Sequence, residues 1–259
     1  MTTEPPMEME RRTRGRGQDA GQRGIPQDKP FDKEKWQPKT LLGKKVKAGE
    51  VTDIDVVLDK GLPLMEAEIA DSLLTGLQTD ILAVGQSKGK FGGGKRSIWR
   101  QTQKKTSEGN KPKFSAVVIA GNRDGYVGMG LGKAKETVPA REKAVRQAKM
   151  NMIKVRRGCG SWECGCGTPH SIPFKVLGRC GSVGIELVPA PRGTNICAEK
   201  ECAKIFALAG IKDLYANTTG STRTKLNLIK ACMDALVKLS QVKIQPEQIK
   251  SRGIKEGNK

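Results

Sequence analysis

Residues 114–134 read FSAVVIAGNRDGYVGMGLGKA, and this stretch decides the fold class. Its first seven residues form a compact run rich in strand-forming side chains, and an extended pattern resumes over residues 126–131. Between the two runs, Asn122-Arg123-Asp124-Gly125 carries the chemistry of a tight turn. The stretch therefore predicts an antiparallel β-hairpin.

The predicted hairpin lies between two segments whose apolar residues have helical spacing. A helix is expected over about residues 134–152, with Pro139 near its start and a buried stripe formed by Val138, Val145, Ala148 and Met152. Upstream, apolar residues recur at helical spacing over 62–73, and residues 81–84 read as a strand. This order predicts an α+β layer in which helices cover one face of a sheet.

A second α+β layer is expected downstream. Strands are predicted over 172–177 and 180–188. A helix should follow, with Gly210 just past its end, and a last helix should start in the Thr-rich turn 218–224. The predicted buried residues of this layer are Val183, Ile185, Leu187, Ala198, Cys202, Ile205, Phe206, Ala209, Leu226, Ile229, Met233 and Leu236.

These patterns divide the chain into five segments. Residues 1–50 combine 12 basic with eight acidic residues and few aliphatics, so we expect a mixed tail anchored at Trp36, either a mobile leader or an arm that threads RNA. The expected segments are the tail 1–50, a first domain 51–157 with an extended basic loop 86–113, a Gly/Cys/His linker 158–170, a second domain 171–240 and a polar tail 241–259.

Composition points to a polyanion as the partner. The 259 residues contain 47 Lys and Arg against 27 Asp and Glu, which gives a net charge of +20. No apolar run approaches the roughly 20 residues needed to cross a bilayer, and residues 1–27 hold no hydrophobic stretch of a secretory signal. A membrane or secreted protein is therefore not expected, and the cytoplasm is the predicted location.

Two stretches concentrate the positive charge. The loop 86–113 has nine Lys and Arg residues against Glu108, and residues 133–157 have nine against two acidic residues. Gly128, Gly130 and Gly132 precede the second stretch, so a phosphate backbone could approach the main chain there. The alternative is an ordinary solvated helix face. A nucleotide-binding P-loop is not supported, because Gly132-Lys133 is followed by Ala134 instead of Ser or Thr.

A second candidate site is the pattern Cys159-x4-Cys164-x-Cys166-x3-His170. Three thiols and the only histidine of the chain could form a tetrahedral zinc site, and neighbouring glycines allow one loop to fold around the ion. Four protein ligands would make the metal structural. The alternative is a set of reduced thiols beside a structural histidine, because the spacing is not that of a usual zinc finger or ribbon.

Several motifs together resemble one protein family. They are the run 113–157 that contains the hairpin, PHSIPF at 169–174, GRCGSV at 178–183, PAPRGT at 189–194 and AGIKD at 209–213. This pattern is similar to the fifth universal protein of the small ribosomal subunit, over roughly residues 55–240. The cysteine-containing segment 157–167 resembles the archaeal branch in particular.

The resemblance implies an N-terminal domain similar to a double-stranded-RNA-binding fold and a C-terminal βαβα-type two-layer domain, with disordered basic tails. It implies a non-enzymatic role near the mRNA entry channel, in support of translational accuracy. The implied partners are small-subunit ribosomal RNA, the fourth and eighth small-subunit proteins, and mRNA. This chain departs from the family in its extended stretch 90–110.

Seventeen basic residues are candidates for RNA contact. Those up to the first turn of the predicted helix are Lys88, Lys90, Lys95, Arg96, Arg100, Lys104, Lys105, Lys113, Arg123, Lys133 and Lys135, and those further along the chain are Arg141, Arg156, Arg157, Lys175, Arg179 and Arg192. A free double-stranded-RNA-binding regulator is the first alternative, although it would have no need of the second domain. A zinc-dependent enzyme is the second alternative, with Glu163 as its only local carboxylate.

Overall fold

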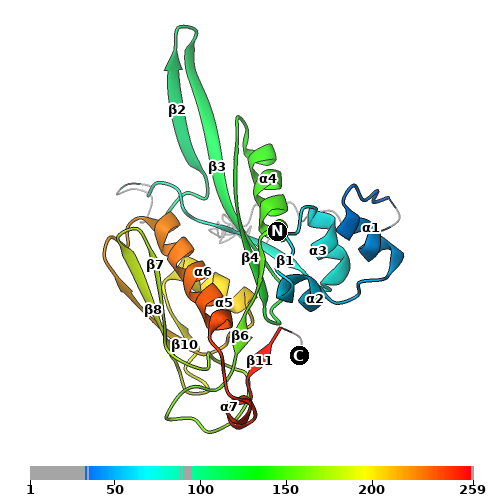
Figure 1. Cartoon of the computed structure of the whole chain (residues 1–259). Coiled ribbons are helices and arrows are strands. Elements are labelled where there is room, and N and C mark those ends of the chain that lie inside the picture. Colours follow the sequence, from blue (N-terminus) through cyan, green and yellow to red (C-terminus); the bar gives the residue numbers. More distant parts are fainter. Residues whose placement is uncertain (1–32, 34, 88, 90–94, 258–259) are drawn as a thin grey trace, which may run out of the picture. The chain divides into compact units, whose positions relative to one another are not determined.

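The computed structural model describes residues 33, 35–87, 89 and 95–257 (Figure 1). Its described part contains two main sheets, each with helices packed against it, which confirms the α+β class. Among the described residues, no helix has the length and apolar character that crossing a membrane requires.

The first sheet is antiparallel, in the order β1-β3-β4-β5, with β2 paired to the outer part of β3. The turn 122–125 joins β3 to β4, so the predicted hairpin is confirmed. The helix α4 packs along β4 and β3 (Figure 1). The strands are β1 (Gln78–Leu82), β2 (Arg100–Thr106), β3 (Gly109–Gly121), β4 (Tyr126–Ala134) and β5 (Met152–Lys154), and the helix is α4 (Thr137–Met150).

The alternate glycines of β4 let α4 lie directly on the sheet. A Cβ atom on Gly130 would lie 2.0 Å from the carbonyl oxygen of Ala144, and one on Gly132 would lie 2.0 Å from that of Ala140. A Cβ on Gly128 would meet the carbonyl oxygen of Ala148 at 2.2 Å. These glycines are therefore covered by the helix, and the prediction that a phosphate backbone approaches them is wrong.

The stripe predicted for α4 is partly wrong. Val145 and Ala148 are buried, but Val138 is 64% exposed, and the buried Met152 lies in β5 because the helix ends at Met150. The helix begins only at Thr137, so Val138 lies in its first turn, where it points away from the sheet that the later turns cover.

Three short helices precede the first sheet: α1 (Leu41–Ala48), α2 (Ile54–Asp59) and α3 (Ala67–Leu73). The Glu66 carboxylate accepts hydrogen bonds from Trp36 Nε1 at 3.0 Å and from the backbone N–H of Thr40 at 2.7 Å. Trp36 itself is only 9% exposed. The expected tail is thus corrected for residues 36–50, which fold against α3, while residues 1–32 lie outside the described part.

The second sheet has the order β7-β8-β10-β9, in which only the β9–β10 pair is parallel. The alternating Val183, Ile185 and Leu187 of β8 are buried, as predicted. Its strands are β7 (Val176–Cys180), β8 (Val183–Pro189), β9 (Ile196–Cys197) and β10 (Leu214–Thr219), and its helices are α5 (Lys200–Leu208) and α6 (Lys225–Gln241).

Two details of this layer differ from the expectation. The first strand begins at Val176 instead of residue 172. Ile172 and Pro173 are buried in the irregular segment that follows the cysteines, where Pro173 has no N–H to donate to a strand ladder. The strand β10 was not predicted, since its sequence LYANTT lacks an apolar alternation and includes part of the Thr-rich turn. Gly210 has φ +81°, as expected of a glycine just past a helix end.

The two layers share one hydrophobic core. Val117 and Ile119 of β3 belong to the same buried cluster as Phe206 and Leu208 of α5. The backbone N–H of Arg123, in the hairpin turn, donates to the carbonyl of Leu208 at 2.9 Å. The first sheet is therefore closed on one face by α4 and on the other by the second layer.

The C-terminal segment packs against the junction and is not the polar tail we expected. It contains α7 (Pro246–Ser251) and β11 (Lys255–Glu256), and β11 pairs with β6 (Arg156–Arg157). The guanidinium of Arg156 donates to the carbonyl oxygens of Leu239 at 3.1 Å and Val242 at 2.5 Å. These bonds tie the end of α6 to the strand that leaves the first domain.

Candidate RNA interface and metal centre

The predicted basic loop is largely a β-hairpin. Strands β2 and β3 pair Thr102 with Lys113, and Lys104 with Lys111. Directly opposed residues share a face of a hairpin, and faces alternate along each strand. Arg100, Lys104, Lys111 and Lys113 therefore lie on one face, which we call the cationic hairpin face, while Lys105 lies on the other. The expectation of a flexible loop is corrected for residues 100–113.

The charges on this face repel one another. Lys104 and Lys111 are directly opposed, and like charges in that position destabilise a strand pair. Lys111 also pairs with Glu108 at 2.7 Å, but both side chains are more than half exposed, so the pair offsets little of the repulsion. An anion bound across the face would relieve the remaining repulsion.

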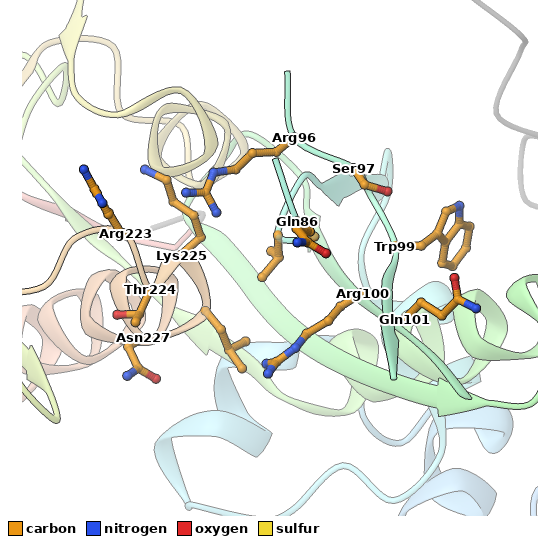
Figure 2. Close-up of a pocket in the computed structure, with 13 residues that line it drawn as sticks. Gln86, Arg96, Ser97, Trp99, Arg100, Gln101, Arg223, Thr224, Lys225 and Asn227 are labelled. Carbon is orange, nitrogen blue, oxygen red and sulfur yellow. The ribbon is translucent and has the colours of Figure 1, made fainter. Parts of the chain in front are cut away.

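A cleft of about 640 Å³ lies where the chain enters β2. Arg96 and Arg100 line it on one side, and Arg223 and Lys225 line it at the start of α6. Figure 2 shows Arg96 and Arg100 extending toward α6, and Trp99 lying beside Gln101. No acidic side chain lines the cleft among the residues that the structure describes. The cleft is therefore suited to bind an anion.

Arg223 and Lys225 are not among the site residues predicted from the sequence. They lie more than 120 residues from Arg100 in the chain, and only the packing of the second layer on β3 brings them to the same cleft. Lys225 also pairs with Glu199 at 3.0 Å. The one signal in the sequence is a pair of basic residues at the end of the Thr-rich turn and the start of the last predicted helix, and such a pair by itself indicates only an exposed turn.

The positive stretch 133–157 divides into exposed and paired residues. Lys149 binds Asp71 at 2.8 Å, and Lys154 binds Asp59 at 2.7 Å. Burial favours the neutral form of Lys154, but Asp59 and the nearby carboxylates outweigh burial and raise its pKa. The residues that remain exposed are Lys133, Lys135, Lys143 and Arg146, and Arg141 is half-buried.

Arg156 and Arg157 have internal partners. They are only 8% and 7% exposed, and Arg157 Nη2 donates to Asp124 Oδ1 at 2.7 Å and to the carbonyl of Gly257 at 3.0 Å. Arg156 adds an ion pair with Glu256 to its carbonyl contacts. Their guanidinium groups are thus used to hold the C-terminal segment, so the expectation that both contact RNA is corrected.

Basic residues also gather at the junction of the two layers. Arg123, Arg192 and Lys212 line a hollow of about 830 Å³ there, together with Asp124 and Asp213. Arg123 has φ +59° in the hairpin turn, and Arg192 is exposed. The hollow is less uniformly positive than the cleft at β2.

The other predicted basic residues are distributed over several elements. Lys175 is exposed and pairs with Glu186, and this hydrogen bond lowers the pKa of the glutamate. Arg179 is exposed on β7, where its Nε donates to the carbonyl of Gly181 at 3.2 Å. Lys95 is exposed, whereas Lys88 and Lys90 lie outside the described residues.

The structure brings Cys159, Cys164, Cys166 and His170 together. Their four ligand atoms all lie within 4.8 Å of one another, so the cluster could hold a metal ion. Hydrogen bonding to Thr168 lowers the pKa of the exposed Cys166 thiol to about 6, whereas burial raises that of Cys159. Three sulfurs and one imidazole nitrogen are the donor set that tetrahedral zinc prefers.

Contacts around the cluster orient its histidine. His170 Nε2 lies 3.8 Å from Cys164 Sγ, and Nδ1 lies 2.8 Å from Asp213 Oδ2. The backbone N–H of Cys159 donates to the carbonyl of Arg252 at 2.9 Å, so the C-terminal segment packs on the same loop. Asp213 carries no signal in the sequence analysis beyond its place in the AGIKD motif.

The two α+β layers and their cationic surfaces are typical of a protein that binds a polyanion. Residues 98–156 match the N-terminal domain of ribosomal protein S5, and residues 178–252 match its C-terminal domain. The chain belongs to the ribosomal protein S5 family, which makes it a structural protein and not an enzyme.

Archaeal relatives are similar over most of their length. "Small ribosomal subunit protein uS5" of Nanoarchaeum equitans is 50% identical, over 87% of this chain and 96% of the relative. Proteins of the same name from Methanococcus maripaludis strain C6 and Methanocaldococcus jannaschii are 46% and 45% identical over 88% of this chain, covering 93% and 98% of the relatives. These matches confirm the archaeal type of the resemblance.

Proposed function

We propose that the chain binds small-subunit ribosomal RNA near the mRNA entry channel and supports translational accuracy there. The observation that carries this proposal is the cationic hairpin face, where four cations lie on one side of two strands and two of them are directly opposed. Ribosomal RNA supplies the closely spaced phosphates that such a face would neutralise. The family resemblance adds contacts with mRNA and with the fourth and eighth small-subunit proteins.

We extend the proposed RNA surface to the cleft at β2 and to the exposed side of α4. In the cleft, arginine can bind phosphate through two parallel hydrogen bonds, and Trp99 can stack on an unpaired base. The proposed contact residues are Lys95, Arg96, Arg100, Lys104, Lys105, Lys111, Lys113, Arg123, Lys133, Lys135, Arg141, Lys143, Arg146, Lys175, Arg179, Arg192, Arg223 and Lys225.

The hairpin face can be tested by removing its charge without changing its strands. The full chain with Arg100, Lys104, Lys111 and Lys113 all changed to Gln is compared with wild type for binding to a small-subunit ribosomal RNA transcript at several salt concentrations. Each lost phosphate contact should reduce the slope of log affinity against log salt by about 0.9, so the total change should approach about 3 to 4.

For comparison, Lys105→Gln removes one proposed contact from the opposite face of the same strand. It should change the slope by no more than one contact's worth, about 0.9. An unchanged slope in the four-residue variant would refute the role of the face. Co-sedimentation of the tagged chain with small subunits tests the wider proposal.

We also propose that the Cys/His cluster binds one zinc ion with a structural role. Cys159, Cys164, Cys166 and His170 would supply all four ligands, which leaves no open coordination position. When bound, zinc would cross-link the loop 159–170 and so hold the junction on which the C-terminal segment packs. Elemental analysis of the purified, reduced chain should find one zinc per chain, and its absence would contradict the proposal.

A further inference from the structure

His170 connects the cysteine cluster to a buried carboxylate. It is 6% exposed and Asp213 is 3% exposed, and the 2.8 Å contact joins His170 Nδ1 to Asp213 Oδ2. A carboxylate in this position keeps the proton on Nδ1 and leaves the lone pair of Nε2 for a metal. Since Nε2 faces the thiol of Cys164, the orientation of the ring matches metal binding by this nitrogen.

The second oxygen of Asp213 holds a surface turn. Oδ1 accepts hydrogen bonds from the backbone N–H of Gly193 at 3.0 Å and of Asn195 at 2.9 Å. Both residues have positive φ, +94° and +62°, a conformation that costs free energy for asparagine and needs support from its surroundings. The turn carries Arg192, which is exposed.

We propose that the metal ion, His170, Asp213 and the turn 191–195 act as one unit that presents Arg192 to an RNA phosphate. The metal fixes the plane of the imidazole, the imidazole fixes the carboxylate, and the carboxylate fixes the turn. Asp213 is thus a positioning residue for both metal binding and RNA binding. This inference rests on the proposed metal site and adds to it a link with the RNA surface.

The link can be separated from general folding. The backbone N–H groups of Lys212 and Asp213 donate to the carbonyl of His170 at 2.9 and 3.1 Å, and these bonds do not involve the metal ligands' side chains. The strand β10 that follows is paired with β8 over its full length. Removing the metal should therefore loosen the turn while the second sheet stays folded.

The first experiment compares zinc-loaded full chain with chain stripped by a chelator under reducing conditions. Hydrogen exchange at the amides of Gly193 and Asn195 should become about tenfold faster or more without zinc, because contacts that change metal affinity about tenfold must change the stability of the turn by the same factor when the metal leaves. Amides of β8 should be unchanged. Equal exchange at Gly193 and Asn195 in the two forms would overturn the inference.

The second experiment asks whether Arg192 depends on the metal to bind RNA. With a small-subunit ribosomal RNA transcript, Arg192→Ala should reduce the salt slope by about 0.9 in zinc-loaded protein and by nothing in stripped protein. Lys143→Ala, on the exposed side of α4, is the control and should have the same effect in both forms. An equal effect of Arg192→Ala in both forms would overturn the link.

Asp213→Asn provides an independent test. The carboxylate accepts hydrogen bonds from His170 on one oxygen and from the turn on the other, whereas an amide has only one accepting oxygen. Zinc affinity, measured by competition with a chromophoric chelator, should fall about tenfold or more. Unchanged zinc affinity would overturn the positioning role. If the purified chain binds no zinc, the proposed metal site is wrong. If it binds zinc but the turn 191–195 is unaffected by zinc removal, only the link between the metal and the turn is wrong.

Discussion

The close packing of α4 on the glycines of β4 predicts that Gly130→Ala destabilises the fold. The added Cβ would lie 2.0 Å from the carbonyl oxygen of Ala144 and 2.3 Å from the backbone nitrogen of Ala148. Ordinary contacts of this kind exceed about 3.4 Å, so the helix must move by more than about 1 Å along much of β4. Because both atoms belong to the backbone, no side-chain rotation relieves the contact.

We expect Gly130→Ala to lower the free energy of unfolding by about 3 kcal/mol, the upper part of the range for overpacked cores. The assay is urea unfolding of the full chain, followed by circular dichroism. Gly184→Ala is the matched control in a strand, since its nearest neighbour is the Thr219 hydroxyl, which can rotate away. It should cost less than about 1 kcal/mol.

The Gly130→Ala variant also distinguishes a packing role of the β4 glycines from a role in binding a phosphate backbone. If they serve packing, RNA affinity measured under conditions where Gly130→Ala is folded should match that of wild type. A stable variant that has lost RNA affinity would refute the packing argument and restore the idea of a phosphate approaching β4.

Two further predictions concern groups that hold the segments outside the sheets. Arg156→Gln should lower the free energy of unfolding by about 3 kcal/mol in urea denaturation, because the buried carbonyl of Leu239 and the partly buried carbonyl of Val242 lose a charged donor. It should leave the salt dependence of RNA binding unchanged, and a reduced salt slope without destabilisation would contradict this. Burial favours the neutral form of Glu66, but hydrogen bonds from the backbone of Thr40 and Lys39 outweigh it and lower its pKa below 4.5. The ionised form therefore stabilises the fold above pH 4.5, and that contribution is lost as pH falls through the lowered pKa. Glu66→Gln should flatten the decrease in thermal stability below this pH, and a decrease as steep as that of wild type would show that Glu66 is not its source.

The basic hairpin shows why part of the interface could not be predicted. Strands are recognised from alternating apolar and polar residues, and β2 is exposed along nearly its whole length, so it has no such alternation. The excess of Lys and Arg was visible in the sequence, but their arrangement on one face depends on the register between β2 and β3. The same holds for Arg156 and Arg157, whose charges suggested RNA and whose burial shows internal contacts.

The sequence by itself determined the features that depend on neighbours along the chain. These are the hairpin at 114–134, the apolar alternation of β8, the turn after α5 and the clustering of three cysteines with one histidine within 12 residues. Local propensity and spacing are sufficient for such features because the interacting groups are close in the chain.

Only the tertiary structure decided the features that join distant segments. Packing of the second layer on β3 brings Arg223 and Lys225 to the cleft that Arg96 and Arg100 line. Folding of the AGIKD segment places the Asp213 carboxylate in contact with His170 Nδ1. The burial of β4 glycines under α4 is of the same kind. In each case the position of a group is set by a shared core between segments far apart in sequence, which no local pattern records.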